Sequence, residues 1–325
     1  MNTNSKASSW NLALVGFLTV ALVLSALFVA YPAAVVAEDG AQPDARNSAS
    51  PQAPDTNGVL IDNGTIQLGV HSEAQLNVPG GPPSSGTGVT TVGLRFLPTG
   101  AESTAPGCLC EGWGAADAYS GVTGYANEAV DGIVNITPVS FFTTTTTAVS
   151  TVDIGTALRV THDYHPSPAT PYLYEVEVTI ENTSAAVVQP RYRRVMDWDI
   201  EPTAFAEYVT IQTGTASDIL FTSDNGFETA NPLGSQGFIN FTGEAIDDGP
   251  ADHGALWDFQ FADLNPGESY TFYTYYGAAE NEAAADGALA AVGAEAYSYG
   301  QPSAPYDPAV GDPNTFIFAF GGVGG

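Results

Sequence analysis

Residues 172–180 read YLYEVEVTI, and this alternation is the clearest structural signal in the chain. Successive side chains of a β-strand point to opposite faces, so its large apolar groups would share one face: Tyr172, Tyr174, Val176, Val178 and Ile180. The positions between them include two glutamates, which suit solvent. The stretch therefore predicts a strand with one buried face and one solvated face.

Similar patterns continue towards the C-terminus. Residues 255–261 (ALWDFQF) alternate with period two, while 270–276 (YTFYTYY) and 316–320 (FIFAF) are apolar on both faces. The Ala-rich residues 280–297 predict the one helix of the body. Many short strands, regular turns and one late helix predict an all-β fold, an antiparallel β-sandwich in one piece or as two packed halves.

The N-terminus carries an unbroken apolar run, LALVGFLTVALVLSALFVA at residues 12–30, followed by small residues up to Ala37. The run is longer than an ordinary signal core and close to the ~20 residues that span a bilayer. We expect residues 1–37 to form either a cleaved signal peptide or a membrane anchor. Residues 38–57, rich in Pro, Ala, Ser and Asp, predict a flexible linker, and residues 58–325 predict an extracellular domain.

The charge balance restricts the classes of partner. Seven Lys and Arg face 36 Asp and Glu, giving a net charge of −29 at pH 7. Such a surface repels phosphate backbones, so the composition argues against nucleic-acid binding. It favours solubility and weak binding of cations. A hydrophobic content of 44% is ample for a packed core.

The only two cysteines, Cys108 and Cys110, lie in the segment GCLCEGWG. Outside the cell such a pair tends to oxidise, so we expect a structural role, as a disulfide or as two thiols in a turn. Two cysteines do not supply the ligands of a structural zinc site.

Residues 191–201 (RYRRVMDWDIE) hold the strongest candidates for chemistry. On a strand, Asp197 and Asp199 would share a face ~6–7 Å apart at Cα, which suits acid–base catalysis or cation binding, with Glu201 as a third candidate. The alternative is a structural ladder of Arg and Asp, with Arg194 turned inward to an acid elsewhere in the chain. The scarcity of basic residues, three of which fall in this stretch, favours structural pairing.

A second candidate site is His162-Asp163-Tyr164-His165. His162, Asp163 and His165 could begin a metal site, but no third clear ligand follows, and the nearby prolines at 166 and 168 predict a loop. Calcium could bind at the acidic loop 247–253, although no DxDxDG pattern supports it.

Four Asn-X-Ser/Thr sequons would matter only in a host that glycosylates exported proteins. Asn182 is the first choice because it follows the strand of residues 172–180 in a predicted turn. The remaining sequons lie at Asn63, Asn135 and Asn240.

At GCLCEGWG (107–114), YRRVMDWDIEPT (192–203), DHGALWDF (252–259) and NTFIFAFGGVGG (314–325), the chain resembles an extracellular β-rich domain that recurs in bacterial and archaeal surface proteins. The resemblance spans about residues 58–325. It implies an extracellular β fold, and it carries no assigned activity.

Neither a nucleophile elbow nor a phosphate-binding loop occurs in the sequence. We therefore expect a non-catalytic module, secreted or tethered at the cell surface, with a structural, adhesive or glycan-binding role. Glycans would contact an exposed Trp113 or clustered Tyr side chains. The alternatives are a carbohydrate-active enzyme using Asp197 and Asp199, and a subunit that self-assembles by strand addition into a filament or surface layer.

Overall fold

The structure is a computed structural model that describes residues 58–304, 307 and 310–324. The predicted signal or anchor segment, 1–37, and the predicted linker, 38–57, lie outside the described residues. Within the described ranges, no helix is both long enough and apolar enough to cross a membrane.

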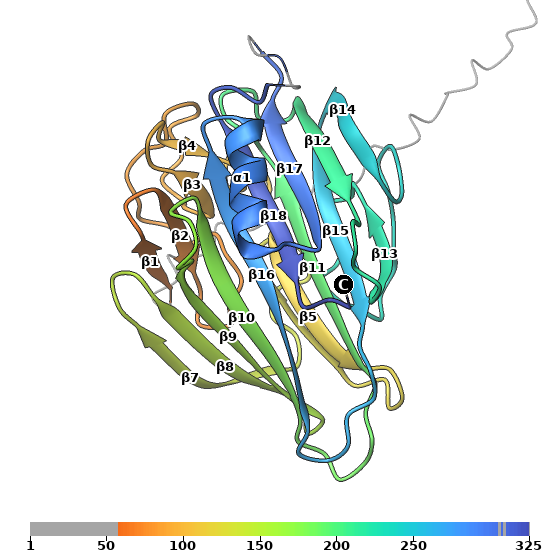
Figure 1. Cartoon of the computed structure of the whole chain (residues 1–325). Helices are drawn as coiled ribbons and strands as arrows, with labels where there is room; N and C mark the ends of the chain where they lie inside the picture. The colour runs from red at the N-terminus through yellow and green to blue at the C-terminus, as the bar shows by residue number, and fades with distance from the viewer. Residues whose placement is uncertain (1–57, 305–306, 308–309, 325) are drawn as a thin grey trace, which may run out of the picture. The chain divides into compact units, whose positions relative to one another are not determined.

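Eighteen strands and one helix form the described part of the chain, and every paired strand is antiparallel to its neighbour (Figure 1). This confirms the predicted β-rich fold with one late helix. A small sheet holds four strands: β1 (Val59–Asp62), β2 (Ile66–Val70), β3 (Leu94–Phe96) and β4 (Ala101–Glu102).

The largest sheet has nine strands, and its two edges are β14 and β7. Their spatial order is β14 (Ala245–Ala251), β12 (Glu207–Gln212), β17 (Ala296–Pro302), β18 (Thr315–Gly321), β16 (Ser269–Ala279), β10 (Leu173–Asn182), β9 (Leu158–Pro166), β8 (Ala148–Ile154) and β7 (Ile136–Thr143). The third sheet has five strands: β13 (Ile219–Ser223), β15 (His253–Gln260), β11 (Pro190–Trp198), β5 (Gly112–Asp117) and β6 (Thr123–Asn127).

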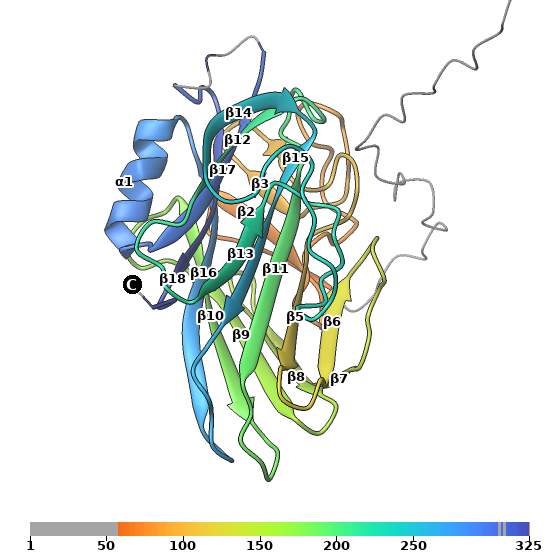
Figure 2. The same cartoon turned by 90° about the vertical axis from the view of Figure 1, so that its right-hand side faces the viewer.

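The five-stranded sheet faces the nine-stranded sheet across one shared apolar core (Figure 2). Tyr192 of β11 meets Phe272 of β16 edge to face, with ring centroids 5.0 Å apart. The rings of Phe259 of β15 and Phe320 of β18 are tilted by 59°, with centroids 4.7 Å apart. Aromatic pairs at these separations add to the free energy gained by burying their area, so they tie the two sheets together.

Strand β10 contains this stretch, and its alternation is as predicted from Tyr174 to Ile180, whereas Leu173, predicted on the outer face, is buried beside the helix that follows β16. Tyr174, Val176, Val178 and Ile180 are fully buried, whereas Glu177 is exposed. The strand lies between β9 and β16, in the middle of the large sheet. Its inner face therefore contributes to the main core, as the spacing indicated.

The helix α1 (Glu282–Val292) is shorter than the predicted range 280–297. The side chain of Asn281 caps its first turn, and Gly293 ends it in the left-handed conformation at φ 65°. The residues after Gly293 turn into β17, because the aromatic alternation there matches a strand better than a helix. Ala285, Ala288 and Leu289 pack the helix onto the outer face of β16 and β18 (Figure 1).

Strand β11 is buried on both faces, which the sequence did not predict. Tyr192, Arg194, Met196 and Trp198 face the main core. The opposite face is covered by the long connection between β13 and β14, because Ala230 packs there in a small apolar cluster. Arg193, Arg194 and Asp197 are consequently removed from water, whereas Arg191 at the start of the strand is half-buried.

Candidate metal centre

Three aspartates from two parts of the chain lie close together at the end of β11. Asp197 lies in β11, Asp199 follows it, and Asp252 connects β14 to β15. One carboxylate oxygen of each lies within 4.8 Å of those of the other two. The antiparallel register explains the meeting, because Asp197 pairs with Gly254, two residues after Asp252.

A fourth acid, Glu207 at the start of β12, belongs to the same electrostatic group. It is fully buried, and its Oε1 accepts a hydrogen bond of 2.7 Å from the backbone N–H of His253. Its other oxygen, Oε2, is buried without a hydrogen-bond partner. We call Asp197, Asp199, Asp252 and Glu207 the acid cluster.

Burial makes this cluster costly without a cation. Asp197 is 1% exposed, and neither of its carboxylate oxygens has a hydrogen-bond partner. Burial, followed by the charges of Asp199, Asp252 and Glu207, raises the pKa of Asp197 well above its ordinary value. Burial also raises the pKa of Glu207, and the negative charges of Asp199 and Asp252 add to that rise. The cluster therefore needs either bound protons or a positive ion to be stable.

Glycines let the backbone close tightly around Asp197. A Cβ added at Gly226 would lie 2.6 Å from Cα of Asp197, and one at Gly254 would lie 2.3 Å from Cα of Gly226. Any side chain at either position would push against main-chain atoms that cannot move aside. The main chain at Gly226 and Gly254 therefore packs directly against the main chain of β11 beside Asp197.

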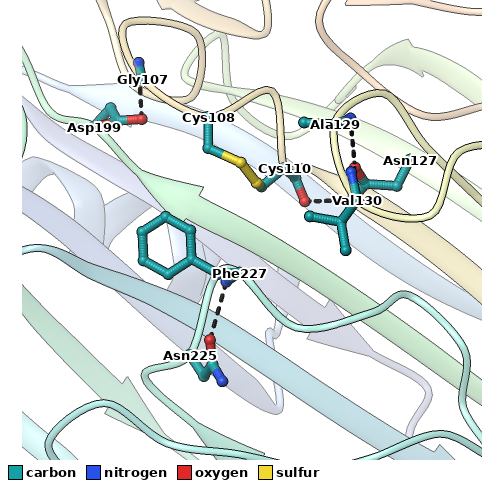
Figure 3. Close-up of a disulfide and its surroundings, with 9 residues drawn as sticks. All are labelled: Gly107, Cys108, Cys110, Asn127, Ala129, Val130, Asp199, Asn225 and Phe227. Carbon is teal, nitrogen blue, oxygen red and sulfur yellow. Dashed lines mark hydrogen bonds between the residues drawn. A yellow bond between two sulfur atoms is a disulfide. The ribbon is translucent and has the colours of Figure 1, made fainter. Parts of the chain in front are cut away.

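Asp199 is held from the other side by the loop that carries the cysteines. The N–H of Gly107 donates to Oδ2 of Asp199 at 3.1 Å (Figure 3). Cys108, which follows Gly107 directly, is bonded to Cys110 as a disulfide, and both cysteines are buried. Asn127 donates to the carbonyl of Cys110 at 2.6 Å and anchors the same loop to β6. The structural role expected for the two cysteines is therefore the positioning of this loop beside Asp199.

His253 connects the cluster to a second buried acid. Its Nδ1 lies 2.9 Å from Oδ2 of Asp224, and its main-chain N–H is the donor to Glu207. Burial opposes ionisation of Asp224, but hydrogen bonds from His253 and from the N–H groups of the loop at 239–241 lower its pKa below the ordinary value. His253 consequently fixes the orientation of Glu207 from outside the cluster.

The donor set fits a hard divalent cation. Calcium takes carboxylate oxygens at 2.3–2.6 Å, so two oxygens bound to one ion stand at most about 5 Å apart. The separations of up to 4.8 Å among the aspartates fall within that limit. A calcium ion would also accept the irregular arrangement of carboxylates, because its coordination is flexible.

The third catalytic candidate, Glu201, lies apart from this cluster. Its carboxylate accepts hydrogen bonds from Ser84, Thr87 and the main chain of Gly86 and Glu102. Burial opposes ionisation, but these bonds lower the pKa of Glu201 below its ordinary value. The ionised carboxylate of Glu201 therefore holds the loop at 84–87 by hydrogen bonds next to the segment that follows β11.

The predicted metal group at His162, Asp163 and His165 is not assembled. The segment is part of β9 and not a loop, so His162 and His165, three residues apart, point to opposite faces. His162 is fully buried, 4.3 Å from the ring of Trp113, and burial together with Arg194 holds its pKa well below the ordinary value. Asp163 and His165 lie on the outer face, where His165 neighbours Glu175.

Two of the three arginines of β11 pair with acids: Arg194 with an acid elsewhere in the chain, as predicted, and Arg193 with an acid of the neighbouring strand, whereas Arg191 bonds Gln260. Arg193 bonds Asp258 through two hydrogen bonds of 2.6 and 2.8 Å. Arg194 turns inward and donates through Nε to Glu111 at 2.6 Å. Asp197 and Asp199 are not the partners of these arginines, so the predicted ladder of Arg and Asp does not extend to them.

Two further expectations about surface residues are changed by burial. Trp113 is fully buried and donates to the carbonyl of Glu73 at 2.6 Å, so the prediction that it is exposed to glycans is wrong. Asn182 is also buried, and its amide donates to the carbonyls of Ala186 and Leu264, which leaves it the least accessible sequon. The other sequons are less enclosed: Asn63 is half-buried, and Asn135 and Asn240 are exposed.

Sequence reasoning missed Asp252 and Glu207. Asp252 was noted only as part of an acidic loop, and Glu207 carried no motif at all. Both reach the cluster through sheet pairing, Glu207 in β12 of the large sheet and Asp252 beside β15 of the smaller one. Local spacing holds no signal for such a meeting.

Comparison with family models and with curated proteins finds no match for this chain.

Proposed function

We propose that this chain is a non-catalytic module of the cell exterior, with a structural or adhesive role, whose β-sandwich body is completed by a bound calcium ion. The acid cluster supplies the ligands. The single observation that supports this proposal most is Asp197, a buried aspartate whose two carboxylate oxygens lack hydrogen-bond partners and which faces two further aspartates.

Calcium explains the cost of this arrangement better than catalysis does. A glycosidase carboxylate must reach a sugar, but Asp197 and Asp199 are 1% and 0% exposed. A cation needs only the oxygen atoms, and its charge would offset the mutual repulsion of the acids. Extracellular modules use such sites at ambient calcium of about 10⁻⁴–10⁻³ M.

Direct binding tests the proposal. The protein is dialysed against EDTA and then against metal-free buffer, and Ca²⁺ is titrated in by isothermal calorimetry. We expect one site with a dissociation constant of about 10⁻⁴–10⁻³ M, and Asp252→Asn should weaken it at least tenfold. Asp252 is the best position for this change because it is the least buried of the three aspartates.

Asp163→Asn is the matched control, since it removes one carboxylate from the other predicted metal group. It should leave calcium affinity unchanged. Wild-type protein that takes up no Ca²⁺ in the calorimeter, or equal weakening by Asp252→Asn and Asp163→Asn, would count against the acid cluster as a calcium site.

Glycan binding is a second candidate role. A pocket of about 440 Å³ is the place where we expect a glycan to bind. Apolar rings and two carboxylates line this pocket, a combination that suits the apolar and hydroxyl faces of a sugar: Phe96, Tyr172, Pro98, Pro171, Pro313, Glu280 and Asp312. Tyr172→Ala should abolish retention on any polysaccharide that the wild type binds. Retention that survives this change would exclude the pocket.

A further inference from the structure

Strand β7 forms one edge of the nine-stranded sheet and pairs only with β8 among the described strands. Such an edge presents main-chain donors and acceptors that can pair with another chain. Natural proteins protect edges with charged residues, proline, bulges or very short strands. The two edges of this sheet differ in how far they use these protections.

The opposite edge, β14, is well protected. It carries Asp247, Asp248 and Pro250, and its pairing with β12 is interrupted by register shifts. A second acidic chain brought against this edge would meet two carboxylates directly. Strand addition at β14 is therefore disfavoured by both charge and geometry.

Edge β7 has protection only in its first half. Pro138 and a register shift between Pro138 and Ser140 interrupt the ladder there, but Ser140–Thr143 continue in regular register with β8. The sequence holds no charged residue from Gly132 to Val152. The second half of β7 is thus an uncharged and regular edge.

Exposed apolar side chains are frequent along the same segment of the chain. Of the eleven large hydrophobic residues that are exposed in the described chain, four lie within residues 133–142: Ile133, Val134, Val139 and Phe142. Phe142 is 69% exposed, although it sits inside a regular strand. Figure 1 shows β7 at the outer margin of the sheet, beyond β8. An exposed phenylalanine on a regular edge, unpaired among the described strands, indicates an interaction surface.

The net charge of the chain indicates which partner covers the β7 edge. The chain carries a net charge of −29, so two copies repel each other at most of their surfaces. An uncharged edge with exposed apolar groups is a surface where one copy can approach another without placing acid against acid. A basic partner would gain nothing from this edge, because no carboxylate lies within residues 132–152.

We propose that β7 of one copy pairs antiparallel with β7 of a second copy through residues 140–143, with Phe142 packed across the junction. The same surface on both copies makes the contact isologous, so the assembly closes as a dimer with two-fold symmetry. A filament would require β7 to pair with β14, whose acids and proline oppose it. The nine-stranded sheets of two copies become one continuous sheet.

A matched pair of substitutions tests the edge. Phe142→Asp and Ile246→Asp each place one new charge on a side chain of nearly equal exposure, 69% in β7 and 68% in β14. The full chain, purified in a mild detergent, is examined by sedimentation velocity over a range of concentrations. We expect a wild-type dimer that Phe142→Asp weakens at least tenfold and that Ile246→Asp leaves intact.

The dependence on salt concentration distinguishes binding of a second copy from binding of a basic partner. Screening reduces repulsion between like-charged chains, so the dimer should strengthen as NaCl is raised from 0.05 to 1 M. Dimers that dissociate with added salt overturn the argument from charge. A wild-type chain that stays monomeric at about 100 µM across this range overturns the proposal, and so does equal dissociation by both substitutions.

Cysteine cross-linking gives a second measurement that does not disturb Phe142. Both native cysteines are bonded to each other, so Ser140→Cys or Thr143→Cys adds one reactive thiol. A flexible bis-maleimide, in which each of the two double bonds adds one thiol, reaches across a small offset in register and should join two copies at one of these positions far more than at Ile246→Cys. Equal cross-linking at the two edges, or none at β7, overturns the pairing.

Discussion

Replacing Asp197 by asparagine should change the stability of the protein in opposite directions with and without calcium. Without the ion, Asp197 is a buried carboxyl that faces three other acids. Asparagine has no carboxyl group, so the free energy spent on keeping a buried acid protonated at this position is no longer required. With the ion, the same change removes a ligand.

The size of both effects can be bounded. Keeping a carboxyl of ordinary pKa protonated at pH 7 costs about 1.4 kcal/mol for each of ~3 pH units, so Asp197→Asn can stabilise the ion-free protein by at most about 4 kcal/mol. At 10 mM Ca²⁺ and a dissociation constant of about 10⁻⁴–10⁻³ M, the ion stabilises the wild type by roughly 1.4–2.7 kcal/mol. For a domain of this size, 1 kcal/mol shifts Tm by roughly 2 °C.

Differential scanning calorimetry in 1 mM EDTA and in 10 mM Ca²⁺ measures both arms. We expect the wild type to melt about 3–5 °C higher in calcium. The variant should melt higher than the wild type in EDTA and show no calcium dependence. Asp163→Asn, an exposed carboxylate of β9, should behave as the wild type in both buffers.

The reasoning fails if wild-type Tm is the same in both buffers. It also fails if Asp197→Asn lowers Tm by the same amount in EDTA and in calcium, because Asp197 would then have a purely structural role that no cation affects.

Three other changes test separate parts of the structure. Gly107→Ala places a Cβ 2.6 Å from Oδ2 of Asp199, so calorimetric calcium affinity should fall about tenfold. Gly287→Ala, at an exposed position where the added Cβ meets nothing and the backbone is not left-handed, is the control for glycine substitutions. Glu111→Ala leaves the buried guanidinium of Arg194 unpaired and should cost about 3–5 kcal/mol in urea denaturation, while Glu177→Ala at the exposed face of β10 should cost little. In EDTA, the free energy of unfolding should fall as pH rises above about 4. The pKa values of Asp197 and Glu207 are raised from 3.8 and 4.5, so the folded state holds protons that the unfolded state has lost. A flat or rising profile between pH 5 and 8 would contradict the burial of these acids.

Alternation in the sequence predicted those strands that have one wet face. Residues 174–180 show this, because their inner face meets the core and their outer face meets water in β10. The same alternation in residues 255–261 would place Asp258 on a solvated face, opposite Trp257 and Phe259, yet it is 1% exposed. The connection between β13 and β14 covers that side and supplies carbonyls of Thr229 and Ser235 to its partner Arg193. A loop that covers a sheet leaves no periodic signal in the strand beneath it.

The candidate site was predictable in part for the same reason. Asp197 and Asp199 stand out because they are two residues apart on a strand, and the structure brings them together as that spacing indicates. The local sequence also predicted that an acid elsewhere would receive Arg194, but only the fold identifies it as Glu111, 83 residues away. Asp252 and Glu207 depend on strand pairings between distant segments, which the order of residues does not encode locally.

The acid cluster and the β7 edge give the same protein two different responses to its ionic surroundings. Calcium would act at a buried site, where repulsion among carboxylates is strong and little screened by salt. Monovalent salt would act on the whole acidic surface and so on the approach of two copies at β7. A sheet whose one edge is protected by acids and whose other edge is uncharged can therefore pair with itself once and then stop. Calcium dependence of folding and salt dependence of dimerisation should consequently be separable, with Asp252→Asn affecting the first and Phe142→Asp the second.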